Sequence, residues 1–128
     1  MYNDKVMEEF AHPENIGYIE NNDGYGKVGN ASCGDIMEIT IKVEDNIIKD
    51  AKFRTFGCAA AIASSSVATR MIIGKSIDYA KSLTNADVVE ELEGLPPQKI
   101  HCSVLAEEAI SKAVDDYLSK GDKDKSNK

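Results

Sequence analysis

The stretch DIMEITIKVE, from Asp35 to Glu44, alternates apolar and polar side chains. Successive side chains of a strand point to opposite faces, so one face carries Met37, Ile39, Ile41 and Val43 and the other carries Glu38, Thr40, Lys42 and Glu44. The pattern predicts a half-buried strand with its apolar face in the core and its charged face in solvent. Asp45-Asn46 tolerates the positive φ of a tight turn, which predicts a hairpin into a second strand over Ile47 to Phe56.

The remaining elements are arranged around this hairpin. A further strand is predicted around Lys27 to Ala31, and the predicted helices cover Lys5–Phe10, Ala59–Ile72, Ser76–Ser82, Asn85–Leu92 and a last stretch whose apolar stripe runs from Leu105 to Leu118. Strands followed by helices indicate an α+β fold, an antiparallel sheet of about three strands with helices on one face and a long C-terminal helix. We expect one domain over residues 1–120 and a disordered polar tail over 121–128.

Composition excludes several classes of function. The 128 residues carry a formal net charge of −7 with no basic stripe, which argues against nucleic-acid binding. The longest apolar run, Cys58 to Ala63, is far shorter than the roughly twenty residues of a membrane-spanning helix. The N-terminus lacks the basic and then apolar pattern of a secretory signal. We therefore expect a soluble, cytoplasmic protein that binds neither nucleic acid nor membrane.

The three cysteines, Cys33, Cys58 and Cys102, are 25 and 44 residues apart. In a reducing compartment a disulfide framework is improbable, which leaves buried packing, a reactive thiol or a shared metal site. Cys58 and Cys102 each open a predicted helix, where unpaired N–H groups and the helix dipole favour an anion. That placement lowers the pKa of a thiol and favours the thiolate, the form that binds metals and attacks sulfur.

Two further metal-competent side chains flank the cysteines. Asp35 follows Cys33 by two residues, and His101 directly precedes Cys102. Thiolates with imidazole suit zinc or iron–sulfur chemistry and do not suit magnesium or calcium. The alternatives are a turn cap for Asp35 and a capping or surface role for His101. A thiol enzyme with His101 as base is disfavoured, because neighbouring helical residues point about 100° apart.

Three strings around the cysteines resemble a known family. They are ASCGD (31–35), FGC with AIASSS (56–58 and 61–66) and LPPQKIHCS (95–103), and HPENIG (12–17) is similar as well. The chain resembles IscU and the N-terminal domain of NifU, the scaffold proteins of iron–sulfur cluster assembly, over about residues 3–119. The retained His101 and the absence of an insertion favour the stand-alone IscU type over the SufU branch.

The resemblance implies a carrier and not a turnover enzyme. It implies that Cys102 accepts persulfide sulfur from a cysteine desulfurase of the IscS/NifS type. Iron then enters, and a labile [2Fe-2S] cluster forms on Cys33, Cys58 and Cys102 before transfer to acceptor apoproteins. By the same resemblance, Asp35 promotes cluster release and His101 is an alternative fourth ligand.

The resemblance also implies partners. Leu95, Pro96, Pro97, Gln98 and Lys99 match the segment bound by a DnaK-type chaperone with its J-protein, although Gln98 stands where the family usually has valine. Ferredoxin, a frataxin-like protein and a second copy of the chain are further expected partners. The alternative function is a zinc protein that uses Cys33, Asp35, Cys58, His101 and Cys102 to hold Zn²⁺ structurally or as a zinc-dependent sulfur acceptor.

Overall fold

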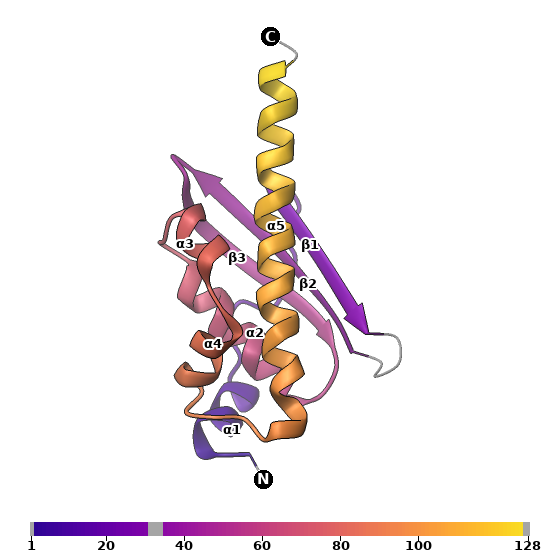
Figure 1. Ribbon diagram of the computed structural model, residues 1–128, viewed down its shortest axis with the longest axis vertical. Coiled ribbons are helices and arrows are strands. Elements are labelled where there is room, and N and C mark those ends of the chain that lie inside the picture. The colour runs from indigo at the N-terminus through magenta and orange to yellow at the C-terminus, as the bar shows by residue number, and fades with distance from the viewer. Residues whose placement is uncertain (1, 31–34, 127–128) are drawn as a thin grey trace.

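The structure is a computed structural model that describes residues 2–30 and 35–126. Along the chain the elements are α1 (Asp4–Ala11), β1 (Gly24–Asn30), β2 (Asp35–Glu44), β3 (Ile47–Phe56), α2 (Ala59–Ile72), α3 (Ile77–Ser82), α4 (Asn85–Glu91), the 3₁₀ helix η1 (Pro97–Lys99) and α5 (Ile100–Ser126). The predicted α+β class is confirmed. The sheet lies behind α5, and the shorter helices gather beside α5 on the same face (Figure 1).

The sheet is an antiparallel meander in the order β1-β2-β3. Both strands of the hairpin have the predicted bounds, and the turn residues Asp45 and Asn46 have φ values of 55° and 63°. The pairing shifts once, between Lys42 and Val43. β1 begins at Gly24, earlier than the predicted Lys27.

The face of the sheet under α5 forms the core. Met37, Ile39 and Ile41 are fully buried there, as the alternation predicted. β1 lies unusually close to α5 because of its glycines. A Cβ on Gly26 would lie 2.1 Å from the carbonyl oxygen of Ala109, so no residue with a side chain fits at this position.

The opposite face differs from the prediction at Thr40, which is 1% exposed instead of lying in solvent. The segment before β1 covers it. The Gly17 amide donates to the Phe53 carbonyl at 2.8 Å, and the Ile19 amide donates to the Thr40 hydroxyl at 3.2 Å. The alternation of apolar and polar residues in β2 does not reveal that Thr40 is buried, because the residues that cover it come from elsewhere in the chain.

Helix α1 is attached to α2 through a partly buried ion pair. Arg70 reaches Glu9 with two hydrogen bonds, at 2.8 and 3.0 Å, and the Ser66 hydroxyl donates to the same carboxylate at 2.9 Å. Ser66 is fully buried, and Glu9 is 6% exposed. Ser66 thus has a structural role, in agreement with its small size on a packed helix.

Helix α5 begins at Ile100, two residues before the predicted start at Cys102, because η1 leads directly into it. It continues to Ser126, into the 121–128 segment for which the sequence predicted disorder. Near that end, Lys120 pairs with Asp116 at 3.1 Å, one turn apart. None of the helices within residues 2–30 and 35–126 is both long and apolar enough to cross a membrane.

Candidate functional site around two cysteine thiols

Cys58 is the residue that begins α2. It has extended backbone angles (φ −82°, ψ 177°) and immediately precedes the first helical residue, Ala59. It therefore occupies the N-cap position that the sequence predicted for it. Its side chain is half-buried, and it lies directly after Phe56-Gly57, where β3 ends.

Cys102 lies in the first turn of α5 and is fully buried. Its Sγ is 3.6 Å from the Sγ of Cys58, although the two residues are 44 positions apart. This spacing is too long for a disulfide, whose S–S bond is about 2.05 Å. The fold therefore brings together two thiols from the starts of two helices. The Cys102 side chain is fully buried, whereas the Cys58 side chain is half-buried.

His101 joins this pair through Cys102. Its Nε2 lies 3.6 Å from the Cys102 Sγ, and its ring is half-buried. The expectation that neighbouring helical residues would not meet was wrong here. Hydrogen bonds to sulfur are longer than those to oxygen, so the imidazole reaches the sulfur of the next residue even though the two side chains leave the helix in different directions.

The surroundings of Cys58 favour its thiolate. Burial raises the pKa of this thiol, but the amide of Ala61, the neighbouring Cys102, the amide of Ala60 and the Lys99 ammonium together hold the pKa below its ordinary value. Amides of the first helical turn and a nearby cation are the features that activate thiols in proteins.

Tyr2 and Lys99 both interact with the Cys58 thiol. Burial, and then the negative charge of Cys58, raises the pKa of Tyr2. Cys58, and then Tyr2, raises the pKa of Lys99. The two residues are far apart in the sequence, so both the N-terminus and the Leu95–Lys99 segment contribute to the surroundings of Cys58.

Two of the predicted site residues cannot be placed fully. Cys33 and the side chain of Asp35 lie outside the described residues. The backbone of Asp35 opens β2 opposite Asn30, and Ile36 pairs with Phe56. The strand ends that flank Cys33 are therefore at the end of the sheet where Cys58 follows β3. In the part of the chain that the structure describes, no group of three or more His, Cys, Asp or Glu side chains is arranged to hold a metal.

The Leu95–Lys99 segment leads into this site. Leu95 packs against the core, Pro97 and Gln98 are exposed, and η1 delivers Lys99 to the start of α5. Two prolines with exposed neighbours leave a short stretch of backbone that a partner could bind. The predicted chaperone contact stays a prediction.

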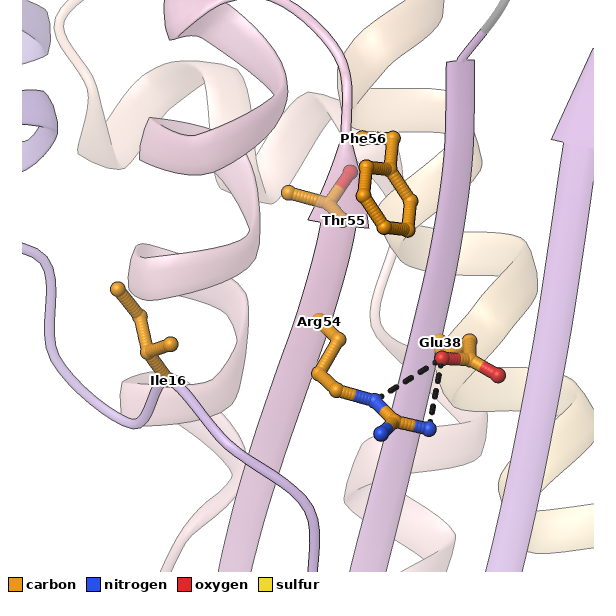
Figure 2. A pocket seen from close by; sticks show the side chains of 5 residues that line it. All are labelled: Ile16, Glu38, Arg54, Thr55 and Phe56. Atoms are coloured by element: carbon orange, nitrogen blue, oxygen red, sulfur yellow. Dashed lines mark hydrogen bonds and ion pairs between the residues drawn. The ribbon is translucent and has the colours of Figure 1, made fainter.

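A pocket that the sequence did not predict lies on the other face of the sheet (Figure 2). It has a volume of about 490 Å³ and is lined by Ile16, Glu38, Arg54, Thr55 and Phe56. Arg54 reaches Glu38 from the neighbouring strand, and Phe56 is 73% exposed. Arg54 and Phe56 are two residues apart on β3, so both lie on the outward face of the sheet. This alternation is the sequence feature that could have identified the surface. Neither Cys58 nor Cys102 lines the pocket.

Comparison with known proteins identifies the family. The family model described as the NifU-like N-terminal domain matches residues 1–124. The chain belongs to the NifU-like N-terminal domain family. It is 56% identical over 123 residues to a protein of Archaeoglobus fulgidus named iron–sulfur cluster assembly scaffold protein IscU 1, covering 96% of this chain and 80% of that protein. The Escherichia coli K12 protein named iron–sulfur cluster assembly scaffold protein IscU is 53% identical over 123 residues, covering 93% of this chain and 95% of that protein.

Solved structures share this NifU-like fold. The N-terminal part of a NifU-like protein from Brucella abortus superposes with a TM-score of 0.76 at 21% identity, covering 92% of this chain and 94% of that one. A structure described as a putative scaffold protein for the SUF system from Fervidobacterium islandicum gives 0.71 at 23% identity, covering 88% and 96%. At these identities the superpositions establish the fold alone.

Proposed function

We propose that this protein is a scaffold on which an iron–sulfur cluster is assembled before it is passed to other proteins. The observation that carries the proposal is the 3.6 Å contact between the Cys58 and Cys102 sulfurs. It occurs in a chain more than half identical to proteins named as iron–sulfur cluster assembly scaffolds.

The sulfur spacing suits a shared metal. Two thiolates on one tetrahedral metal, each bound at about 2.3 Å, lie about 3.8 Å apart. The distance of 3.6 Å between the Cys58 and Cys102 sulfurs is close to this value. Cys33 would supply the third thiolate from the strand ends that flank it.

Cys102 is the proposed sulfur acceptor. Its thiolate attacks the outer sulfur of a desulfurase persulfide, so a new S–S bond forms on Cys102 while the desulfurase S–S bond breaks and its cysteine leaves as thiolate. Two electrons from a ferredoxin-class donor then cleave the Cys102 persulfide into thiolate and sulfide. Because Cys102 is fully buried, the acceptor must become accessible before it can react.

The cluster itself is the cargo. Two irons and two sulfides are held by Cys33, Cys58 and Cys102, and the fourth position is taken by Asp35 or His101. A carboxylate or an imidazole holds cluster iron less tightly than a fourth thiolate, so this position would ease release to an acceptor protein. His101 is already 3.6 Å from the Cys102 sulfur.

The proposed partners are those that the family resemblance implies. A cysteine desulfurase supplies sulfur, a frataxin-like protein assists at the site, and a DnaK-type chaperone with its J-protein binds Leu95–Lys99 during transfer. Pro97 and Gln98 are exposed, which supports contact with such a partner.

Anaerobic reconstitution tests the scaffold role. The protein is incubated with Fe²⁺, a sulfide source and a thiol reductant, and visible absorption and Mössbauer spectra are recorded. We expect a [2Fe-2S] spectrum that Cys33→Ser, Cys58→Ser and Cys102→Ser each abolish. Stable Zn²⁺ binding with no chromophore under any anaerobic condition would instead establish the zinc protein.

The acid at position 35 is tested by transfer kinetics. Asp35→Ala should retain its cluster longer than the wild type when an apo-ferredoxin is added. Asp50→Ala is the matched control, because Asp50 lies in the same sheet and its carboxylate bonds only the adjacent Ala51 amide among the described contacts. Faster cluster loss from Asp35→Ala would refute the labilising role.

A further inference from the structure

Asn3 connects two parts of the chain that are about 90 residues apart. Its Oδ1 accepts a hydrogen bond from the Val6 amide at 2.8 Å and so caps α1. Its Nδ2, which carries two hydrogens, lies 3.0, 3.1 and 3.1 Å from the carbonyl oxygens of Leu92, Glu93 and Gly94, so at least one of its N–H groups is shared between two of them. One side chain therefore begins the first helix and holds the chain just after α4.

The turn that Asn3 holds has an unusual backbone. Glu93 and Gly94 both have left-handed φ values, 60° and 112°. For a residue with a side chain, such as Glu93, this conformation costs about 1 kcal/mol. Carbonyls at the end of a helix also lack partners within the helix, so they depend on donors from elsewhere. The amide of Asn3 is such a donor.

This turn governs the segment that reaches the thiols. Leu95–Lys99 follows it directly and leads into the first turn of α5, where Cys102 is fully buried. On the other side of Asn3, Tyr2 is partly buried against the core, as Leu95 and Cys58 are. Asn3 thus connects the N-terminal segment, which carries Tyr2, to the turn before Leu95–Lys99.

The body of α1 has a separate attachment. Glu9 is bound to Arg70 of α2 by two hydrogen bonds, one helical turn beyond the region that Asn3 caps. Loss of the Asn3 contacts would therefore release the start of α1 and the Leu95–Lys99 segment while the rest of the helix stays docked.

We propose that Asn3 is a clasp that closes the site. While its amide holds the Leu92–Gly94 carbonyls, the Leu95–Lys99 segment stays ordered and Cys102 stays buried. When the clasp opens, the N-terminal residues and this segment loosen together and Cys102 becomes accessible. The proposal concerns access to the thiol and holds whether or not a cluster is assembled there.

The decisive variant is Asn3→Ser. Serine caps a helix as well as asparagine does, but it is too short to reach the three carbonyls and brings no charge. Hydrogen exchange of residues 92–99 and alkylation of Cys102, resolved by mass spectrometry, should both become at least about tenfold faster, the factor that about 1.4 kcal/mol represents. Exchange in α1 beyond its first turn should not change.

Asn22→Ser is the matched control, because Asn22 also donates from its amide to a backbone carbonyl, that of Ile19, at 2.9 Å. It should leave both rates at the wild-type value. Asn3→Ala removes the cap as well, so it should add faster exchange in the first turn of α1.

If Asn3 couples the start of α1 to the turn after α4, a change in that turn must also affect α1. Gly94→Ala forces a side chain into a left-handed position and disturbs the turn from its other end, although the space there is open. It should speed hydrogen exchange of the Val6 and Met7 amides. Gly74→Ala is the control, since Gly74 has a similar φ of 85° and open space but lies after α2.

Two results would overturn the clasp. Wild-type exchange in residues 92–99 together with wild-type alkylation of Cys102 in Asn3→Ser would show that Asn3 only caps α1. Unchanged exchange at Val6 and Met7 in Gly94→Ala, with the turn itself loosened, would show that the two regions move independently.

Discussion

The middle of α5 and its first turn differ sharply in how they are held. Around Ala109 and Ala113 the helix lies so close to β1 that no methyl group fits between them. In the first turn, half-buried His101 lies beside buried Cys102, and the chain that leads there is held from outside by the side chain of Asn3. The same helix is thus fixed by backbone contact in one place and by a few polar contacts in the other. A protein that binds and releases a ligand at one end of a helix needs this division.

Gly26→Ala is the strongest test of the tight region. A Cβ there would lie 2.1 Å from the Ala109 carbonyl oxygen and 2.6 Å from the Ala113 amide nitrogen, and both are backbone atoms that cannot swing away. We expect the free energy of unfolding to fall by about 3 kcal/mol or more, because β1 and α5 must separate. Urea unfolding monitored by circular dichroism measures this.

Lys27→Ala in the same strand is the control, since Lys27 is exposed and its loss should change the free energy of unfolding by less than about 0.5 kcal/mol. A similarly small effect of Gly26→Ala would mean that α5 can shift away from β1 at little cost. The contrast between the two regions of the helix would then be lost.

Glu9→Gln tests the attachment of α1, with the next largest effect. It replaces the buried carboxylate by a neutral amide, while Arg70, whose side chain is 36% exposed, keeps its ion pair to Glu14, so the free energy of unfolding should fall by roughly 1.5 kcal/mol at pH 7. Lys81→Ala, which breaks an ion pair to Asp115 between two exposed side chains, should cost less than about 1 kcal/mol.

The pH dependence gives a second measure of this pair. Burial raises the pKa of Glu9, but the hydrogen bonds and charge of Arg70, with smaller contributions from Ser66 and Lys5, hold the pKa below its ordinary value. Since the folded pKa is lower than the unfolded one, the carboxylate stabilises the fold above about pH 4.3 and this stability is lost as the pH falls through the folded value. Glu9→Gln should therefore flatten the loss of stability as the pH falls below about 4.3. An unchanged acid profile would contradict the assignment.

Arg54→Ala tests the opposite face of the sheet and should have a smaller effect. Arg54 lies 4.4 Å from the ring centre of Tyr18 and pairs with Glu38 at 3.0 Å, but its side chain is half exposed. We expect a loss of about 1 kcal/mol in the free energy of unfolding. A loss as large as that of Gly26→Ala would show that the segment covering this face, and not α5, holds the sheet together.

The sequence predicted the features that neighbouring residues determine and missed those that depend on contacts between distant segments. β2 and β3 have their predicted bounds because a period of two and the Asp45-Asn46 turn are local signals. Thr40 was placed in solvent because its cover comes from residues about twenty positions earlier. Gly24 and Gly26 read as loop residues, since glycine is a poor strand former. Only the contact with α5 explains them.

The site shows the same limit. The position of Cys58 at the start of α2 followed from local sequence, and it is confirmed. Helix α5 begins two residues before its predicted start because Pro97 begins the 3₁₀ helix η1, which leads directly into it, and proline fits the first position of a helical turn. That Cys58 and Cys102 touch is a property of packing between α2 and α5. From the residues alone it was one of three alternatives, and the family resemblance was what favoured it.

Cys58→Ser should have the smallest effect on stability and a complete effect on the proposed function. The amides of Ala60 and Ala61 already favour the Cys58 thiolate, and a serine hydroxyl, which is among the best N-cap groups, can accept hydrogen bonds from the same amides. The free energy of unfolding of the metal-free protein should therefore stay within about 0.5 kcal/mol of the wild type or rise, while cluster formation is lost. Thermal unfolding and anaerobic reconstitution on the same preparation measure both. A clear loss of stability in Cys58→Ser would contradict this contrast. It would show that the fold depends on the Cys58 thiol as it depends on the close contact between β1 and α5, and that this thiol is not kept available for a ligand.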